Sequence, residues 1–439
     1  MRTMQSAVKL RGWMQAVVAV ALVSLVAACG GGGGSSSSSN NSSSTLNGGS
    51  LPASPTQQPT ASTAANTVPI TVGVGTNGVI NIPTVSVTVC APGSTTNCQI
   101  INNIQVDTGS FGLRVVGSVL NQSLLGALPV SSVASGAQLA ECATFADGYT
   151  WGTVRTATVQ ILNQTGTGET TSTAIPIQII GDLASSTVPS RGCGSGSAEN
   201  TVSDLGANGI LGIGTALTDC GTTCSTPSTA VNYSNYFSCP GGTSCTRATV
   251  PLNQQVANPV ANFPVDNNGV IVQLPPVSNT GQSSATGTLV FGIGTQSNNA
   301  LAPAQTFATD GYGDMNNSVY NGTTVQAFFD SGSNAYFFAD SSIALCGSNY
   351  PGFYCPSSAQ TRSITLAGQN STTASVSIGI LSASTLFGST SNYAFNDLAG
   401  QIGGSSSFDL GLPFFYGRHV YYGFDQTANG GQAPYVGFF

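Results

Sequence analysis

From residue 68 onward, short apolar stretches alternate with breaks of Gly, Pro, Asn and Ser that recur about every 8 to 12 residues. Within several stretches, apolar and polar positions alternate strictly, which is typical of strands that bury one side and expose the other. Helical signals are few and short. The pattern therefore predicts an all-β body. The clearest predicted strands are residues 84–89, 153–161, 175–180, 270–274 and 375–380.

Composition narrows the chemistry that this body can perform. Only 6% of the 439 residues are charged, and from residue 12 onward six Arg stand against sixteen acids, a net charge of −10. A surface this acidic does not attract phosphate backbones, so we expect no nucleic-acid partner. The one Lys is Lys9, near the N-terminus, and the one His is His419. Lysine nucleophiles and multi-His zinc sites are therefore excluded, and we expect no cofactor and no metal ion.

Residues 1–29 have the pattern of an export signal peptide. Basic residues within the first eleven positions precede an apolar run at 16–28, which is shorter than the roughly 20 residues of a membrane-spanning helix. The run ends in Leu-Val-Ala-Ala-Cys, which resembles the bacterial lipobox and implies lipidation of Cys29. An ordinary signal with a chance Cys is the alternative. We expect residues 30–68, rich in Gly, Ser, Asn, Pro and Thr, to form a disordered tether.

The export signal sets the expected compartment and the state of the cysteines. We expect a lipoprotein of the bacterial cell envelope that meets the membrane through its lipid anchor, and Gly30 implies by the same resemblance the outer membrane. The ten Cys beyond Cys29 are an even number in an oxidising compartment, which favours disulfides over a zinc site on the four Cys of residues 220–245. The expected pairs are Cys90/Cys98, Cys142/Cys193, Cys220/Cys224, Cys239/Cys245 and Cys346/Cys355.

One pattern occurs twice in the chain, about 220 residues apart. Residues 104–110 read Ile-Gln-Val-Asp-Thr-Gly-Ser, and residues 327–333 read Ala-Phe-Phe-Asp-Ser-Gly-Ser. An element that contains two apolar residues and a Gly follows each copy, at 209–214 and at 409–414. Two copies of one plan predict two similar lobes that face each other.

The repeated pattern resembles the active-site motifs of pepsin-like aspartic peptidases. The resemblance implies an all-β, bilobal fold with pseudo-two-fold symmetry and a cleft between the lobes. It implies an N-terminal lobe over residues 69–255 and a C-terminal lobe over 256–439. The chain also resembles a bacterial lipoprotein family of unassigned function, domain of unknown function 3443, which shares Asp-Thr-Gly-Ser, Gly-Tyr-Thr-Trp-Gly and Gly-Leu-Pro-Phe-Phe.

The chemistry of such enzymes explains why an aspartate recurs. Two carboxylates within hydrogen-bonding distance share one proton, so one acts as general base on a water and the other polarises the scissile carbonyl. The resemblance implies that Asp107 and Asp330 are this catalytic pair. The implied supporting residues are Thr108 and Ser331 for hydroxyl contacts between the lobes, Gly109 and Gly332 for the turns, and Ser110 and Ser333 for hydrogen bonds to the carboxylates.

Residues 145–161 resemble the family's flap hairpin and the strand after it, so we expect substrate contacts from Phe145, Tyr149 and Trp151. Three positions depart from the family pattern. Phe145 occupies the position of the flap Tyr, and Arg114 replaces the Trp that usually partners it. At 412–413, Leu-Pro stands where the family often has Asp.

Two functions of different classes remain open at this point. The first is an acid-acting aspartic endopeptidase of the cell envelope, a monomeric hydrolase that takes a peptide or protein substrate into the cleft. The alternative is a catalytically silent binding or structural envelope lipoprotein on the same fold, which the departures in the flap region favour. Glycoside hydrolysis by paired carboxylates is a third hypothesis, and the motifs favour it less because they match the peptidase pattern.

Overall fold

The computed structural model describes residues 45–46, 49–193, 196–302 and 305–439. The predicted export signal, Cys29 and residues 30–44 of the predicted tether lie outside the described residues. No described helix is both long and apolar enough to cross a bilayer. The described α-helices are short: α2 (Gln122–Ala127), α3 (Val202–Leu205), α4 (Thr222–Ser225), α5 (Pro227–Tyr233) and α6 (Ala383–Leu386).

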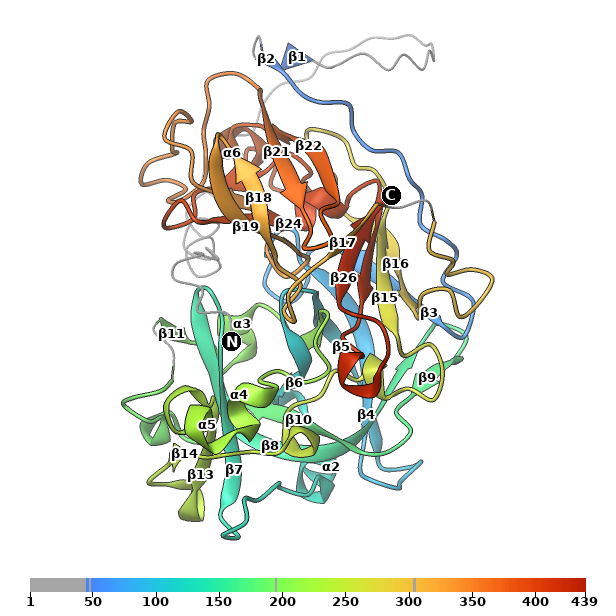
Figure 1. Cartoon of the computed structure of the whole chain (residues 1–439), viewed down its shortest axis with the longest axis vertical. Coiled ribbons are helices and arrows are strands. Elements are labelled where there is room, and N and C mark those ends of the chain that lie inside the picture. The colour runs from blue at the N-terminus through green and yellow to red at the C-terminus, as the bar shows by residue number, and fades with distance from the viewer. Residues whose placement is uncertain (1–44, 47–48, 194–195, 303–304) are drawn as a thin grey trace, which may run out of the picture.

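Two large sheets build two lobes and a layer of strands beside them (Figure 1). The first lobe contains β4 (Pro83–Cys90), β5 (Cys98–Asp107), β6 (Phe111–Val116), β7 (Gln138–Thr144), β8 (Gly148–Leu162), β9 (Gly168–Thr170), β10 (Ile175–Ile180), β11 (Ser197–Ala198), β12 (Gly209–Ile213), β13 (Tyr236–Cys239) and β14 (Thr246–Arg247). The second lobe contains β18 (Met315–Tyr320), β19 (Thr323–Asp330), β20 (Tyr336–Phe338), β21 (Gln360–Ala367), β22 (Thr373–Ile380), β23 (Ala399–Gly400) and β24 (Ser407–Gly411).

The remaining strands form a middle layer that draws on both halves of the chain. It contains β3 (Thr67–Val72), β15 (Gly269–Leu274), β16 (Ala285–Phe291), β17 (Gln305–Ala308), β25 (Arg418–Gly423) and β26 (Tyr435–Phe438). Strand β3 pairs with β4 of the first lobe on one side and with β16 on the other. The middle layer and the first lobe therefore belong to one continuous sheet. A separate two-stranded hairpin is formed by β1 (Thr45–Leu46) and β2 (Gly49–Ser50).

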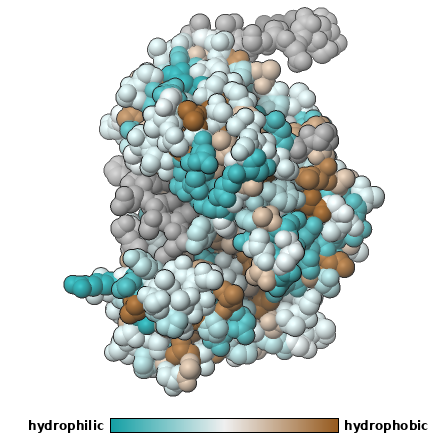
Figure 2. All heavy atoms as spheres, viewed as in Figure 1, coloured by the Kyte–Doolittle hydropathy of each residue, from teal (hydrophilic) through white to brown (hydrophobic). Residues whose placement is uncertain are grey.

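The strands predicted from alternation are present. Strand β10 covers the predicted residues 175–180, and β4, β8, β15 and β22 contain the other four predicted strands and extend beyond them. The surface agrees with the composition, because Figure 2 shows a face of mostly weakly hydrophilic residues with scattered apolar ones. On these strands, uncharged polar residues such as Ser86 of β4 and Ser375 and Ser377 of β22 occupy exposed positions.

The same arrangement of strands occurs in both lobes. In the first lobe, β12 lies parallel to β5 and antiparallel to β6, so that Leu211 pairs with Val106 and with Leu113. In the second lobe, β24 lies parallel to β19 and antiparallel to β20, and Leu410 pairs with Phe329. All five side chains are buried in one apolar cluster that extends through both lobes. The expected bilobal, all-β fold with pseudo-two-fold symmetry is confirmed.

Residues 51–66 are not the disordered tether that their composition predicts. This segment runs along the second lobe and the middle layer towards β3 (Figure 1). Leu51 is buried in an apolar cluster of the second lobe. The N–H and the hydroxyl of Thr60 both donate to Gln273 Oε1, at 2.8 and 2.9 Å, and the hydroxyl of Thr288 donates to the Thr60 carbonyl at 2.6 Å. Thr60 is thus fixed by partners that lie more than 200 residues away in the sequence.

The five expected disulfides are confirmed, with the expected partners. They are Cys90–Cys98, Cys142–Cys193, Cys220–Cys224, Cys239–Cys245 and Cys346–Cys355. Four of them close loops with sequence separations of 4 to 9 residues, whereas Cys142–Cys193 spans 51 residues. The long one connects β7 to the segment before β11, and it therefore constrains tertiary structure rather than a single turn.

Candidate active site

Each Asp of the repeated motif stands at the end of a buried strand. Asp107 is the last residue of β5 and Asp330 is the last residue of β19, and their exposed fractions are 2% and 4%. In the turn after β5, the Gly109 N–H donates to Asp107 Oδ1 at 2.9 Å and the Ser110 hydroxyl donates to Oδ2 at 2.7 Å. The turn therefore supplies two donors to the first carboxylate.

The second turn repeats this geometry. The Gly332 N–H donates to Asp330 Oδ1 at 2.8 Å, and Ser333 Oγ lies 3.0 Å from Asp330 Oδ2. A Gly at the second position after each Asp keeps the turn tight enough for its own N–H to reach the carboxylate. The two copies of the sequence pattern thus become two copies of one carboxylate-binding turn.

The two motifs are joined by reciprocal hydrogen bonds. The Thr108 N–H donates to Ser331 Oγ at 3.1 Å, and the Ser331 N–H donates to Thr108 Oγ1 at 2.8 Å. The Ser331 hydroxyl in turn donates to the Val106 carbonyl at 2.8 Å. A further bond, from Gln105 Nε2 to the Gly332 carbonyl, measures 3.0 Å. These buried contacts hold the end of β5 against the end of β19.

The turn glycines show how close the two carboxylates come. A Cβ on Gly109 would lie 2.5 Å from Asp330 Cγ and 2.6 Å from both of its oxygens. A Cβ on Gly332 would overlap the Asp107 carboxylate and lie 3.0 Å from Asp330 Oδ1. Both carboxylates therefore lie against the opposite motif, on either side of the contact between the lobes. A side chain at either Gly would displace them.

This arrangement can hold one proton between two carboxylates. Like charges at such close range oppose each other, so the pair can hold one proton, with one carboxyl group protonated and the other ionised. The ionised member can accept a proton from a water molecule, and the protonated member can donate to a carbonyl oxygen. The two groups together can perform general acid–base chemistry, with no covalent intermediate required.

A third carboxylate, which the sequence did not single out, shares a hydrogen-bonding partner with Asp330. Asp409 on β24 is 1% exposed, and Ser333 Oγ lies 2.6 Å from its Oδ2 as well as 3.0 Å from Asp330 Oδ2. A hydroxyl has one proton to donate, so it can donate to only one of these carboxylates and must accept from the other. Both contacts are hydrogen bonds when one of the two carboxyl groups is protonated. The second lobe therefore contributes an additional acid to the proton balance of the pair.

Strands β7 and β8 form a hairpin over residues 138–162, here called the hairpin. At its turn, the Phe145 N–H donates to the Gly148 carbonyl at 2.8 Å. Phe145 packs against a small apolar cluster of the first lobe that includes Val116, whereas Ala146 packs against the apolar cluster of the second lobe that contains Phe337. The tip of the hairpin therefore reaches from one lobe to the other.

The expected substrate contact of Trp151 is wrong. Trp151 is fully buried, its ring lies edge-on to Phe237 at 5.5 Å, and its indole N–H donates to Thr187 Oγ1 at 3.1 Å. Side chains alternate along a strand, so Tyr149 lies on the same side of β8 and packs against the same cluster. Of the three residues expected to contact substrate, Phe145 is the one at the turn of the hairpin.

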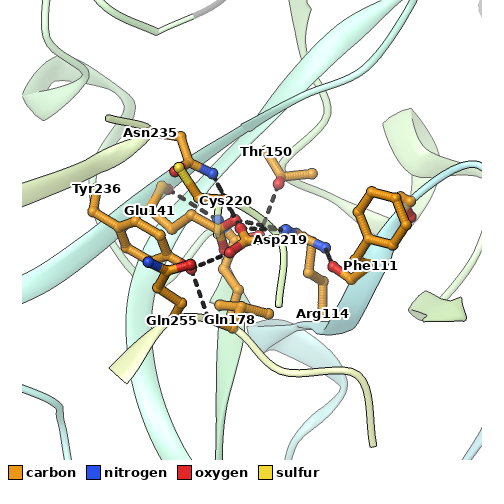
Figure 3. A network of polar contacts seen from close by, with 12 residues as sticks. Phe111, Arg114, Glu141, Thr150, Gln178, Asp219, Cys220, Asn235, Tyr236 and Gln255 are labelled. Carbon is orange, nitrogen blue, oxygen red and sulfur yellow. Dashed lines mark hydrogen bonds and ion pairs between the residues drawn. The ribbon is translucent and has the colours of Figure 1, made fainter. Parts of the chain in front are cut away.

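Arg114 lies in a buried network of polar side chains between the hairpin and the strand that follows Asp107 (Figure 3). Its Nη2 atom lies 2.6 Å from Glu141 Oε1 and 3.0 Å from Asp219 Oδ2, and its Nη1 donates to the Phe111 carbonyl at 2.7 Å. Tyr236 donates to Asp219 Oδ1 at 2.5 Å. The network joins β6, β7, β13 and the loop after β12.

Burial dominates the electrostatics of this network. It raises the pKa of Glu141 well above its ordinary value, Arg114 lowers that pKa again, and Asp219 raises it further. The pKa of Tyr236 is also raised by burial and by Asp219. Burial alone would lower the pKa of Arg114, but the two carboxylates more than offset this and raise it. Arg114 thus stays charged, whereas Glu141 takes up a proton more readily than an exposed Glu.

Sequence reasoning missed Glu141, Asp219 and Asp409. A usable signal was present for Glu141 and Asp409, because each is an isolated acid within an otherwise apolar stretch of a chain with very few charges. An acid in such a position needs a buried partner or a proton. No comparable signal marks Asp219, which lies in a loop before Cys220 and finds Arg114 only in the folded protein.

A family described as "Protein of unknown function (DUF3443)" matches residues 62–438. Among solved structures, the chain is similar to an aspartic proteinase from Irpex lacteus, with 18% sequence identity, 85% of this chain and 97% of that chain covered, and a TM-score of 0.47. No curated protein matches the chain.

Proposed function

The chain belongs to the DUF3443 family of proteins of unknown function, and from the geometry of its site we propose that it is an aspartic endopeptidase in which Asp107 and Asp330 activate a water molecule. The observation that carries the proposal is the pair of reciprocal hydrogen bonds between Thr108 and Ser331. They hold together two turns, each of which presents a carboxylate in similar local geometry, at the junction of the lobes.

Each step of peptide hydrolysis has a group to perform it. The ionised carboxylate of the pair accepts a proton as the water oxygen bonds to the peptide carbonyl carbon. The protonated carboxylate donates to the carbonyl oxygen, which becomes the hydroxyl of a tetrahedral intermediate. The carboxyl group that took the proton of the water then donates it to the peptide nitrogen, and the C–N bond breaks as a hydroxyl of the intermediate returns its proton to the other carboxylate. These transfers yield a carboxylic acid and an amine and restore the pair with its single proton. In this proposal the hairpin, whose turn packs against both lobes, shields these steps from bulk water.

The proposed enzyme works at acid pH, because the pair must retain one proton. Asp409 supports this expectation, since the two contacts of Ser333 are both hydrogen bonds only when either Asp330 or Asp409 is protonated. The substrate is a peptide or an unfolded protein segment, bound in extended form under the hairpin. We place the enzyme in the bacterial cell envelope through a lipid on Cys29, a proposal that rests on the sequence of residues 25–29. Incorporation of labelled palmitate into the wild type but not into Cys29→Ser tests the lipid.

Residues 30–439, expressed in an oxidising host, serve to test the activity. The protein is incubated with unfolded casein between about pH 3 and pH 7, which brackets the pKa values of such carboxylate pairs. We expect cleavage that a statine-type inhibitor blocks and that Asp107→Asn and Asp330→Asn abolish. Asp425→Asn is the matched control, because Asn retains the oxygen that accepts from Thr427, and it keeps full activity.

The proposal is overturned if folded wild-type protein, verified by its cooperative thermal unfolding, cleaves nothing at any of these pH values. It is also overturned if Asp107→Asn cleaves as fast as the wild type. Either result would favour the silent envelope lipoprotein on the same fold.

A further inference from the structure

We propose that Arg114 is a positioning residue of the proposed peptidase: its fork of hydrogen bonds fixes the hairpin over the carboxylate pair. The proposal rests on the function proposed above, because a hairpin that positions substrate matters only if substrate binds beneath it. Arg114 acts through Glu141 and Phe145 and does not itself reach the carboxylate pair.

Arg114 lies on the side of β6 that faces away from the main apolar cluster. Strand β6 starts right after the turn that holds Asp107, and its odd-numbered members Leu113 and Val115 point into the main apolar cluster. Arg114 and Val116 therefore point to the opposite side, where Val116 belongs to the apolar cluster against which the hairpin residue Phe145 packs. An arginine on this side connects its hydrogen-bond partners to β6, the strand that follows the active-site turn.

The hydrogen-bond partners of Arg114 come from separate elements of the first lobe. The Phe111 carbonyl belongs to its own strand, Glu141 belongs to β7 of the hairpin, and Asp219 belongs to the loop after β12. The loop is itself held by the Cys220–Cys224 disulfide and by Tyr236. A planar guanidinium satisfies these acceptors at fixed angles, so the hairpin is held in direction as well as in position.

A small change at the ion pair between Arg114 and Glu141 becomes a larger displacement at the turn of the hairpin. Glu141 lies four residues before Phe145, which at about 3.3 Å per residue makes a lever of about 13 Å from the ion pair to the turn. A tilt of about 5° at the ion pair moves the turn by about 1 Å, and a misplacement of this size can cost about a hundredfold in rate. The guanidinium also lies 6.0 Å from the centre of the Phe145 ring, so it contacts the turn as well as the base.

Stability alone does not account for this network. Burial of one Arg with two acids costs desolvation energy that packed apolar side chains would avoid. Glu141 Oε2 and Arg114 Nε, moreover, have no hydrogen-bond partner among the described residues. A network with such costs is better explained by the geometry that it imposes.

The network also makes the hairpin sensitive to pH. The titratable groups that face Glu141 are Arg114 from β6, Asp219 from the loop after β12 and Tyr236 from β13, and Tyr312 interacts with Asp219 from outside. With Glu141 protonated, one Arg balances one Asp. As the pH rises through the raised pKa of Glu141, a net negative charge forms in a buried site. The hairpin is therefore held best at acid pH, where the proposed reaction runs.

The test compares Arg114→Lys with Arg362→Lys. A Lys keeps the charge but cannot hold three acceptors in a planar fork. Arg362 is the matched control, because it forms a partly buried pair with Asp340 in the second lobe at 2.7 Å, away from the hairpin. Hydrogen exchange is followed at the amides of residues 144–151, and the amides of β15 and β16, which contain none of the substituted residues, serve as internal reference. Peptide hydrolysis gives KM and kcat.

We expect Arg114→Lys to speed exchange of the hairpin amides at least tenfold and to lower kcat/KM at least tenfold, mainly through KM. Arg362→Lys should do neither, although it lowers the melting temperature. Glu141→Gln removes the titrating group but keeps an acceptor, so the loss of hairpin protection at rising pH, corrected for intrinsic exchange, should disappear.

The proposal is overturned if hairpin exchange in Arg114→Lys equals that of the wild type, or if Arg362→Lys speeds it equally. It is also overturned if Glu141→Gln leaves the pH dependence of protection unchanged. Should the wild type hydrolyse no peptide, the exchange measurements still decide whether Arg114 holds the hairpin, so failure of the proposed function and failure of this inference give different results.

Discussion

A single methyl group at Gly109 should disable the carboxylate pair while leaving the fold in place. In Gly109→Ala, the new Cβ would lie 2.5 Å from Asp330 Cγ, whereas Cβ atoms in proteins essentially never come closer than 3.0 Å to another heavy atom. The φ of Gly109 is not positive, so the backbone accepts Ala without strain. The clash must therefore be relieved by the carboxylate of the opposite lobe.

The required displacement sets the expected magnitude. To reach a separation of 3.0 to 3.4 Å, Asp330 must retreat by about 0.5 to 0.9 Å, which breaks the match between the two carboxylates. A misplacement near 1 Å in an active site costs about a hundredfold in rate, or about 2.7 kcal/mol of activation free energy. We expect kcat/KM for a peptide substrate at acid pH to fall by about this factor.

The assay pairs Gly109→Ala with Gly126→Ala, which adds the same methyl group in helix α2 where nothing lies within 4 Å. The control should keep full activity and gain about 0.5 to 1 kcal/mol of stability, because Ala is the better helix former. Binding of a statine-type inhibitor, measured by calorimetry, should weaken in Gly109→Ala and not in the control. Full activity and full inhibitor affinity in Gly109→Ala would refute the claim that the two carboxylates meet across this glycine.

Three further perturbations test other parts of the structure. Ser331→Ala removes a fully buried hydroxyl that donates to the Val106 carbonyl, and it should lower the free energy of unfolding in urea by about 1 to 3 kcal/mol. Ser331→Thr should restore this stability, and an unchanged midpoint in the Ala variant would contradict the expectation. Burial raises the pKa of Asp397 to about 7, so the stability that its protonated form provides is present at pH 4 and lost as the pH rises through 7. Asp397→Asn should flatten the dependence of unfolding free energy on pH over this interval, and a slope that persists would exclude Asp397 as its source. Replacing Cys142 and Cys193 by Ala should cost about 4 kcal/mol in thermal unfolding, against about 2 kcal/mol for the disulfide with the shortest loop, and equal costs would refute the argument from loop length.

Features that are encoded within a few neighbouring residues, or by a pattern that occurs twice in the chain, could be predicted from the sequence. Strand β10 was predicted to the residue, because alternation within six positions encodes which side is buried. Four disulfides follow from short spacings, and Cys142–Cys193 follows from what remains once they are formed. The positions of Asp107 and Asp330 could be found because the same pattern occurs twice, although neither copy states how far apart the carboxylates lie.

Features that depend on a distant partner could not be predicted. Residues 51–66 have the composition of a linker, yet they are fixed by the second lobe and the middle layer. The side of β8 that Trp151 occupies depends on register, and a shift by one residue would reverse it. The interaction of Arg114 with Glu141 and Asp219 joins positions that are 27 and 105 residues away in the chain.

The amino-acid sequence by itself determined the all-β class, the pairing of cysteines and the two aspartate motifs, because each is encoded within a few residues and the motif is encoded twice. The tertiary structure alone decided that both aspartate turns lie at one junction of the lobes, that Asp409 shares Ser333 with Asp330 and that a buried Arg114 binds Glu141 of the hairpin. These are contacts between segments that burial brings together, and their energies depend on the dielectric and the geometry of the folded interior, which no local pattern encodes.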